Sequence, residues 1–364
     1  MKVLYVDLER EWRGGQSQAL LTVKGLNALG HDAQLLSVRG SPLARRAKDA
    51  GVPVHEIGQR ARQVGATFLL RKLLSEQRYD VLHANEPHAL TAAWLAGAQK
   101  SLPVLISRRV AYPLSPNRLA RRRYQIAQRI IVISHFVEKS VLQSGVPPER
   151  LTVVYEGVEI QPLPTPEARQ QARHSWGVAK TERLVGCVGY LLPEKGQEIV
   201  VRALSPVRAK IPGTRLLLAG DGPCRPALEA LVLQLGLQDA VIFAGFVEDV
   251  PRVYAAVDAF VFPSLAEPLG TSLLAAMAWG LPVLAVASGG VPEYVKDGDN
   301  GLLVARPEAE LFSAAMMRLL SDESLRIALG HEARRTIEAR LSAERMVENT
   351  ITVYQEVLWE KQRI

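Results

Sequence analysis

The most informative part of the sequence is Val261-Phe262-Pro263-Ser264-Leu265-Ala266-Glu267-Pro268-Leu269-Gly270-Thr271-Ser272-Leu273-Leu274-Ala275-Ala276-Met277-Ala278-Trp279-Gly280. Its pattern predicts a short apolar strand that ends at Pro263 and a helix that begins near Thr271 and ends at Gly280. Glu267 lies in the loop between them. Ligands of open α/β sheets bind beyond the carboxyl ends of the strands, so this loop is a candidate site.

The same alternation of strand and helix continues along the whole chain. Predicted strands in the first half are 2–6, 33–38, 80–83, 103–107, 130–134 and 152–155. In the second half they are 183–189, 215–220, 241–245, 259–263, 282–287 and 302–304. Apolar, β-branched runs between helical segments are typical of parallel strands that helices cover on both faces. The sequence therefore predicts an α/β protein with two doubly wound, Rossmann-like sheets.

The boundary between the two sheets is expected in residues 159–166, where Pro162, Pro164 and Pro166 interrupt any periodicity. We expect a first domain at 1–160 and a second at 161–342. The remaining segment, 343–364, has apolar residues at helical spacing. Such a helix could pack on either domain.

The positive charge of the chain is concentrated in its first half. The formal net charge is +7, and residues 1–160 hold 23 basic and 13 acidic side chains against 21 and 24 in the rest. A half of net charge +10 commonly faces a phosphate-bearing substrate, a nucleic acid or an acidic membrane surface. A basic face that is merely solvated is the alternative.

The sequence gives no reason to expect a metal. Cys187 and Cys224 have no second Cys or His cluster nearby, so no zinc pattern follows. Asp297-Gly298-Asp299 precedes Asn300-Gly301 and is interpreted as a turn. No cofactor is expected either.

Two features of the sequence bear on the cellular compartment of the protein. Residues 268–292 carry no charge, but their glycines and prolines would break a membrane-spanning helix. The N-terminus reaches Asp7 without the apolar run of a signal peptide. We therefore expect a cytoplasmic protein.

Three loops carry residues suited to an anionic ligand. Gly14-Gly15 precedes a predicted helix, whose N–H groups and dipole favour an anion. Lys195 ends the loop that begins at Gly189, where its ammonium could neutralise a diphosphate. Glu267 could hold sugar hydroxyls while phosphate oxygens meet the helix start at Gly270 to Ser272. A plain turn, or a lysine that is only solvated, is the alternative for the first two loops.

At this point the sequence resembles the retaining glycosyltransferases of family 4. The motifs that carry the resemblance are Glu267-Pro268-Leu269-Gly270, Gly280-Leu281-Pro282-Val283, Ser288-Gly289-Gly290-Val291-Pro292-Glu293, Gly14-Gly15, Asp80-Val81-Leu82-His83, Val132-Ile133-Ser134, Lys195-Gly196, Gly220-Asp221-Gly222-Pro223, Gly245-Phe246-Val247 and Asp297-Gly298-Asp299-Asn300-Gly301. They occur in the order that the family shows and span nearly the whole chain.

The resemblance implies the GT-B fold, in which two Rossmann-like domains face each other across a cleft and the last helix crosses back to the first domain. It implies transfer of a sugar from a nucleotide-diphosphate sugar with retention of configuration and without a metal. Catalytic roles would fall to Lys195, Glu267 and His83. Donor binding would involve Gly14, Gly15, Gly189, Val247, Leu269, Gly270, Thr271 and Ser272.

The acceptor would bind to the first domain and is expected to be anionic or lipid-linked, as in cell-envelope polysaccharide synthesis. Asn85 and Glu86 follow His83, and Arg108 and Arg109 precede a predicted basic helix that runs from Asn117 to Ile130. Arg121 and Arg122 on this helix could touch anionic headgroups, which would give peripheral membrane contact. A nucleic-acid partner is not expected, because no stacking platform accompanies the charge.

Two departures from the family pattern leave other functions open. Ala275 stands where the family has a second acid that holds the nucleotide ribose, and Tyr190 stands where an arginine often follows the glycine of the diphosphate loop. The chain could therefore be a catalytically silent relative that binds nucleotide sugar or acts as a scaffold. The third hypothesis is a GT-B epimerase that acts on a nucleotide sugar.

Overall fold

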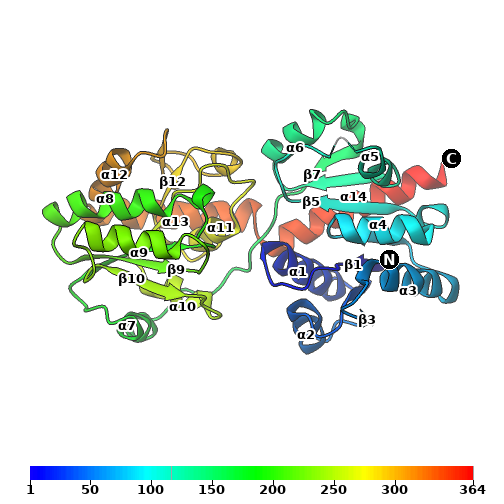
Figure 1. Cartoon of the computed structure of the whole chain (residues 1–364), viewed down its shortest axis with the longest axis horizontal. Coiled ribbons are helices and arrows are strands. Elements are labelled where there is room, and N and C mark those ends of the chain that lie inside the picture. Colours follow the sequence, from blue (N-terminus) through cyan, green and yellow to red (C-terminus); the bar gives the residue numbers. More distant parts are fainter. Residues whose placement is uncertain (116, 364) are drawn as a thin grey trace. The chain divides into compact units, whose positions relative to one another are not determined.

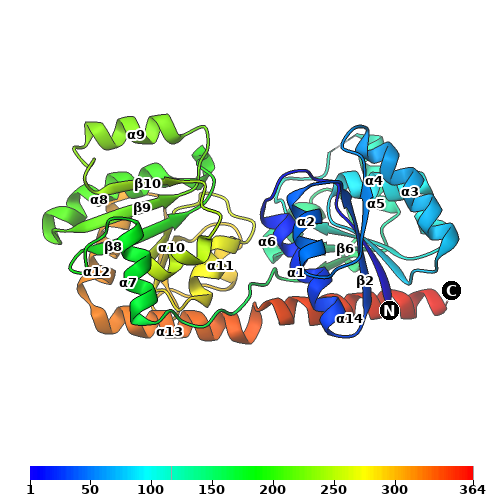
Figure 2. The ribbon, with the colours of Figure 1, turned by 90° about the horizontal axis from the view of Figure 1, so that it is seen from below.

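The computed structural model describes residues 1–115 and 117–363. It divides into two compact units, the first formed by Met1–Gly157 with Ala343–Ile364 and the second by Val158–Ser342. Each unit contains its own parallel sheet (Figures 1 and 2). The α/β architecture with two Rossmann-like units is as predicted from the alternation of strands and helices.

Unit 1 contains a 7-stranded parallel sheet in the order β3-β2-β1-β4-β5-β6-β7. Its strands are β1 (Lys2–Val6), β2 (Asp32–Val38), β3 (Val54–Ile57), β4 (Val81–Ala84), β5 (Val104–Arg108), β6 (Arg129–Val132) and β7 (Leu151–Val153). Its α-helices are α1 (Gly14–Ala28), α2 (Pro42–Asp49), α3 (Arg62–Glu76), α4 (Pro87–Ala96), α5 (Arg118–Gln125), α6 (His135–Leu142) and α14 (Ala343–Gln362).

Unit 2 contains a 6-stranded parallel sheet in the order β10-β9-β8-β11-β12-β13. Its strands are β8 (Arg183–Val188), β9 (Thr214–Ala219), β10 (Val241–Gly245), β11 (Ala259–Phe262), β12 (Val283–Val286) and β13 (Leu302–Val304). Its α-helices are α7 (Pro166–Ser175), α8 (Gln197–Lys210), α9 (Arg225–Gln234), α10 (Val250–Ala256), α11 (Thr271–Ala278), α12 (Ala309–Ser321) and α13 (Glu323–Arg340). A short 3-10 helix, η3 (Pro193–Lys195), precedes α8.

Three details differ from the sequence prediction. Strand β3 was missed because its His55 and Glu56 interrupt the apolar run, which an edge strand tolerates. The basic helix α5 ends at Gln125 instead of Ile130, because residues 129–132 pair with β5 as strand β6. The expected linker lies within unit 2, where the Gln161 carbonyl accepts a hydrogen bond from Arg334.

Helix α14 completes the core of unit 1 although it lies at the far end of the sequence. Val347, Val353 and Tyr354 belong to the same buried cluster as Val3 and Tyr5 of β1. One close contact of α14 is with α1, where Val347 faces Gly25. Among the described residues, no helix combines the length and apolar character needed to cross a membrane.

The α1–α14 contact makes a stability prediction. A methyl group at position 25 would lie 2.5 Å from a Val347 methyl carbon, closer than packed carbon atoms allow. We expect Gly25→Ala to lower the free energy of unfolding by about 1–2 kcal/mol, because overpacking outweighs the gain in helix propensity. Chemical denaturation measures it.

Val347→Ala is the second substitution of a double-mutant cycle with Gly25→Ala, because it removes the methyl groups that would collide with the new one. The double variant should be more stable than the sum of the single effects indicates. Gly58→Ala is the control, since nothing lies within 4 Å of a methyl group there. Equal stability of Gly25→Ala and wild type would contradict the close packing.

Candidate active site

The central feature of unit 2 is an ion pair at the carboxyl ends of its strands. Lys195 Nζ lies 2.6 Å from Glu267 Oε2. The Ser264 hydroxyl donates to the same carboxylate oxygen at 2.9 Å. Lys195 belongs to the loop after β8, and Glu267 to the loop after β11. The structure thus brings together the two residues predicted to be catalytic in this unit.

Glycines allow the loops around Glu267 to approach each other. A methyl group at Gly289 would lie 1.9 Å from the Glu267 carbonyl oxygen, and one at Gly196 would lie 2.3 Å from that of Pro263. Gly290 N–H also donates to the Glu267 carbonyl at 2.9 Å. Backbone therefore packs on backbone on both sides of the glutamate.

The start of α11 lies beside this ion pair. Gly270 has a positive φ of 98° and precedes Thr271 and Ser272, the first residues of the helix. Among the described side chains, none caps this helix start. Leu269 is buried, and its carbonyl accepts a hydrogen bond from Tyr294. A helix start without a side-chain cap leaves N–H groups that can bind an anion.

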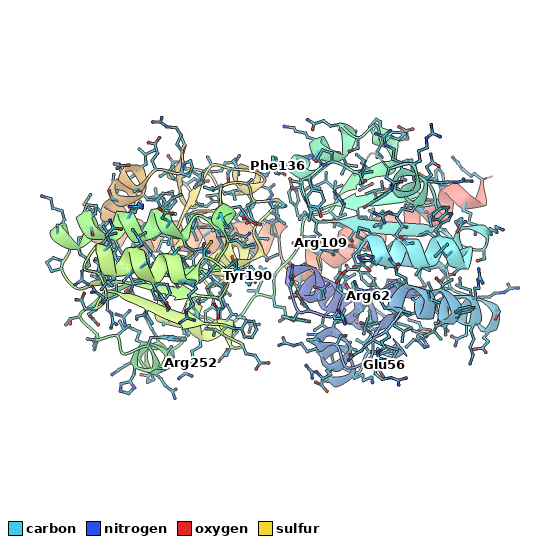
Figure 3. All side chains as sticks on the ribbon, in the orientation of Figure 1. Glu56, Arg62, Arg109, Phe136, Tyr190 and Arg252 are labelled. Carbon is cyan, nitrogen blue, oxygen red and sulfur yellow. The ribbon has the colours of Figure 1, made fainter. Side chains whose placement is uncertain are left out.

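The loops after β8, β9 and β10 form the neighbouring part of the edge. Gly189 lies against Gly220, where a methyl group would be 2.0 Å from the Gly189 carbonyl oxygen. Tyr190 is an exposed aromatic side chain here (Figure 3). Phe246 is a second exposed aromatic side chain, and Val247 is half-buried. Ala275 is also half-buried on α11. Apolar surface is thus available beside the glycines.

Unit 1 has a buried polar network beneath its Gly14-Gly15 loop. Asn85 donates to Asp7 Oδ2 at 2.6 Å and to the Gly15 carbonyl at 3.2 Å. Its amide oxygen accepts from Tyr5 at 2.9 Å and from Arg109 at 2.7 Å. The network joins residues that follow β1, β4 and β5. Asn85, expected to meet the acceptor, instead holds the start of α1.

The arginines of the expected anionic surface divide into two groups. Arg108 is buried and donates to the carbonyl of Tyr112, while Arg109 forms a 2.7 Å ion pair with Glu156. These two do not belong to an exposed basic surface, because their guanidinium groups serve internal contacts. Arg121 and Arg122 are exposed on α5.

The structure does not support His83 as a catalytic residue. Its side chain is buried in the sheet, with Nδ1 2.6 Å from the Tyr354 hydroxyl and Nε2 2.8 Å from the Ser107 hydroxyl. Burial lowers the pKa of His83 to about 3, so the ring remains neutral. Both nitrogens are engaged, and the histidine connects β4 to α14.

Glu86 caps the start of α4. Its carboxylate accepts from the N–H groups of His88 and Ala89, and from that of Leu8 at 3.2 Å. Burial, with the neighbouring Asp7 carboxylate as the second cause, raises the pKa of Glu86 to about 7. Glu86 therefore changes charge near neutral pH.

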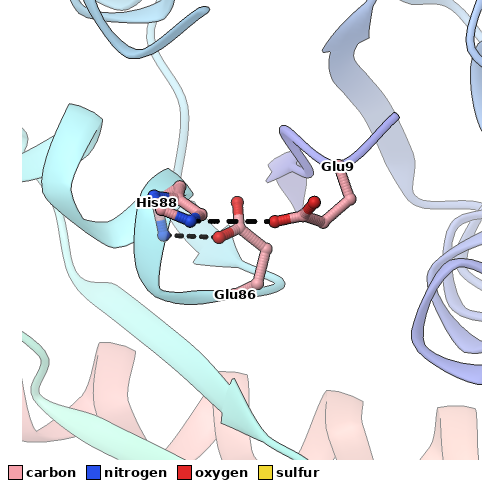
Figure 4. Close-up of side chains that lie close together, drawn as sticks. All are labelled: Glu9, Glu86 and His88. Carbon is pink, nitrogen blue, oxygen red and sulfur yellow. Dashed lines mark hydrogen bonds and ion pairs between the residues drawn. The ribbon is translucent and has the colours of Figure 1, made fainter. Parts of the chain in front are cut away.

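Sequence reasoning missed the group that Glu86 forms with Glu9 and His88 (Figure 4). One ligand-type atom from each of the three lies within 4.8 Å of the others, a spacing that a metal ion could bridge. No linear motif marks this group, since Glu9 and Glu86 follow different strands. Asp297, by contrast, forms the turn that was expected, because its carboxylate accepts from the Leu303 N–H at 2.8 Å.

Comparison with known proteins assigns this fold to the GT-B glycosyltransferases that use a nucleotide sugar. Two family models match the chain, "Glycosyltransferase Family 4" over residues 12–161 and "Glycosyl transferases group 1" over residues 168–336. The chain belongs to glycosyltransferase family 4.

Curated relatives agree with this assignment. The chain is 30% identical over 277 residues to the GDP-mannose-dependent alpha-(1-6)-phosphatidylinositol monomannoside mannosyltransferase of Mycolicibacterium smegmatis, covering 72% of each protein. It is also 30% identical to the uncharacterized glycosyltransferase MJ1607 of Methanocaldococcus jannaschii, over 64% of this chain and 60% of that protein.

Solved structures show the same fold at lower identity. The Anabaena protein HepE in complex with UDP-glucose has a TM-score of 0.86 at 23% identity, covering 98% of this chain and all 100% of HepE. Sucrose-phosphate synthase from Thermosynechococcus elongatus has a TM-score of 0.77 at 22% identity, covering 99% of this chain and 100% of its own. These likenesses establish the GT-B architecture.

The raised pKa of Glu86 predicts a pH-dependent stability. A carboxyl whose pKa is higher in the folded protein than the ordinary 4.5 stabilises the fold below that value and loses this contribution as pH rises through about 7. Glu86→Gln keeps an oxygen that can accept the N–H groups. The free energy of unfolding of this variant, taken relative to that of wild type, should therefore rise by up to about 3 kcal/mol between pH 5 and pH 8.

Urea denaturation of both proteins at the two pH values measures this gain. Glu76→Gln, at the exposed end of α3, is the control and should show no such gain. A stability difference between wild type and Glu86→Gln that is independent of pH would contradict the raised pKa.

Proposed function

We propose that this protein is a retaining, metal-independent glycosyltransferase that moves a sugar from a nucleotide-diphosphate sugar to a lipid-linked or envelope glycan. The observation that carries the donor half of this proposal is the Lys195–Glu267 ion pair beside the α11 helix start. A cation, a carboxylate and helix N–H groups are the donors and acceptors that a sugar diphosphate needs.

In the proposed mechanism, Lys195 neutralises charge that develops on the departing diphosphate. The N–H groups at Gly270, Thr271 and Ser272 add to this stabilisation. Glu267 binds hydroxyl groups of the donor sugar. Before donor binds, the two charged side chains neutralise each other, so each is held in place for its later partner.

The nucleotide is proposed to bind along the loops after β8 and β10. Gly189 permits close approach of the backbone, and Val247 with the exposed rings of Tyr190 and Phe246 offers apolar surface to a base. Tyr190 can thereby contribute stacking where the family often has an arginine. Ala275 leaves the ribose without the family's acidic partner.

The acceptor is proposed to be anionic or lipid-linked. The net charge of +10 in residues 1–160 supports this, and so do relatives whose names specify a phosphatidylinositol monomannoside mannosyltransferase and a lipopolysaccharide core glycosyltransferase. Arg121 and Arg122 would face anionic headgroups at the cytoplasmic side of a membrane. Such contact would be peripheral.

The absence of an acid at position 275 also favours a second candidate, a silent relative that binds nucleotide sugar without transferring it. An epimerase would instead convert the donor without any acceptor. Mass spectrometry of products from the purified protein, supplied with UDP-, GDP- and ADP-sugars and a cell lipid extract, separates the three. A glycosylated lipid supports the transferase, whereas an epimerised donor or no product overturns it.

The electrostatic mechanism predicts large losses of turnover. Lys195→Ala and Glu267→Ala should each lower kcat by about 100-fold or more, because each removes a preorganised contact to the reacting group. Lys210→Ala, at the exposed far end of α8, is the matched control and should retain full activity. If kcat fell by no more than about threefold in both site variants, this mechanism would be contradicted.

The Ala275 position makes a separate prediction about affinity. Ala275→Glu restores the family acid on the half-buried face of α11, where it can accept hydrogen bonds from ribose hydroxyls. We expect nucleotide to bind about tenfold tighter or more, by isothermal titration calorimetry. Ala230→Glu, at an exposed position of α9, is the control. Unchanged affinity would show that ribose is held in another way.

A further inference from the structure

The Ser264 hydroxyl is a buried polar group for which the proposed mechanism has no role. Ser264 is 3% exposed and lies in the loop after β11, three residues before Glu267. Its hydroxyl oxygen is 2.9 Å from Glu267 Oε2 and 3.4 Å from the Glu194 carbonyl oxygen. A hydroxyl carries one proton, so it donates to one of these two acceptors at a time.

The carboxylate of Glu267 is the favoured acceptor. Its oxygen is the nearer of the two and belongs to a charged group, and hydrogen bonds to charged groups are the stronger kind. The Glu194 carbonyl, in contrast, already accepts the Leu265 N–H at 2.8 Å. The proton of the Ser264 hydroxyl is therefore assigned to Glu267.

A neighbouring loop fixes the main chain of both residues. The Ser288 hydroxyl, beyond β12, donates to the Ser264 carbonyl at 2.7 Å. Gly290 N–H, in the same loop as Ser288, donates to the Glu267 carbonyl at 2.9 Å. The residue that donates and the residue that accepts are thus both held before their side chains meet, which lowers the entropy cost of the contact.

The two carboxylate oxygens of Glu267 are engaged unequally. Lys195 Nζ and the Ser264 hydroxyl both contact Oε2. Among the described residues none donates to Oε1, and Oε1 is not one of the buried atoms that lack a partner, so solvent reaches it. The side chain as a whole is only 11% exposed. An open oxygen on a carboxylate that is otherwise held in place is suited to accept a hydroxyl group of a ligand.

Lys195 is shared between two partners. Its ammonium neutralises Glu267 in the free protein, and the proposed function assigns the same ammonium to the departing diphosphate. As Lys195 turns toward the diphosphate, its contact with Glu267 weakens. Of the described groups that donate to Oε2, the Ser264 hydroxyl is then the one that remains.

We propose that Ser264 is a positioning residue for the donor sugar. Its hydroxyl holds Glu267 Oε2 while Lys195 serves the diphosphate, so Oε1 stays directed at the sugar hydroxyls. This inference rests on the transferase function proposed above, and it assigns sugar binding to Ser264 and Glu267 as a pair. Ser264 acts through Glu267 and does not itself contact the donor.

A double-mutant cycle tests the pair. Isothermal titration calorimetry of the full chain with UDP-glucose, GDP-mannose and ADP-glucose selects the nucleotide sugar that binds most tightly. We expect Ser264→Ala to weaken binding of that ligand about tenfold, as for a lost hydrogen bond to a charged group. In a Glu267→Ala background the same substitution should change affinity by less than about twofold, because the group through which Ser264 acts is gone.

Two variants of similar shape separate the hydrogen bond from packing. Ser264→Thr keeps the hydroxyl and should bind donor within about threefold of wild type, whereas Ser264→Val lacks it and should bind as weakly as Ser264→Ala. Ser313→Ala is the control, because Ser313 is also buried in unit 2 but its hydroxyl donates to the Glu310 carbonyl. It should bind donor as wild type does.

A thermal melt of each variant checks that the fold is retained. If Ser264→Ala does not fold, Ser264→Cys takes its place in the cycle, since a thiol is a weak donor. If Ser264→Thr does not fold, the cycle decides by itself.

Three results would overturn the proposal. One is unchanged donor affinity in Ser264→Ala, and another is an equal loss in the wild-type and Glu267→Ala backgrounds, which a merely structural role would give. The third is a folded Ser264→Thr that binds donor as weakly as Ser264→Val. Wild type that binds no nucleotide sugar overturns the transferase function together with this inference, whereas wild type that binds donor beside an unaffected Ser264→Ala overturns this inference alone.

Discussion

Parallel pairing of every strand is the constraint on which the rest of this structure depends. Each crossover helix returns the chain to the same side, so the carboxyl ends of all strands of a sheet meet at one edge. This rule places the loops of Lys195 and Glu267 at the same edge, where the two side chains form an ion pair. The same rule assembles Asp7, Asn85 and Arg109 in the other unit.

Close backbone packing is the second requirement of these edges. Gly196, Gly220 and Gly289 each lie so near a carbonyl oxygen of another loop that no side chain fits. Main-chain contacts between the loops therefore help to place Lys195 and Glu267, together with the Ser264 hydroxyl that donates to Glu267. This arrangement explains why the site motifs are rich in glycine around few charged residues.

The sequence alone was sufficient for the elements and loops that have linear signatures. The apolar strands, the Glu267 loop and the Gly270 helix start are local patterns, and the structure has them. The sequence was insufficient where two residues in contact lie far apart along the chain. Nothing near His83 indicates that Tyr354 closes over its ring, and nothing near Arg109 indicates that Glu156 neutralises it. The group of Glu9, Glu86 and His88 was missed for the same reason, since the loops after β1 and β4 both contribute to it.

The charges of this protein act differently at long range and at short range. The excess of basic residues in the first half acts over about a Debye length, so it can attract an anionic surface or molecule without contacting it. Within a few ångströms, however, individual partners decide what a charge can do. Arg109 is paired with Glu156 and Arg62 lies against Glu9, so neither guanidinium adds to an exposed basic surface although both count toward the charge of the half-chain.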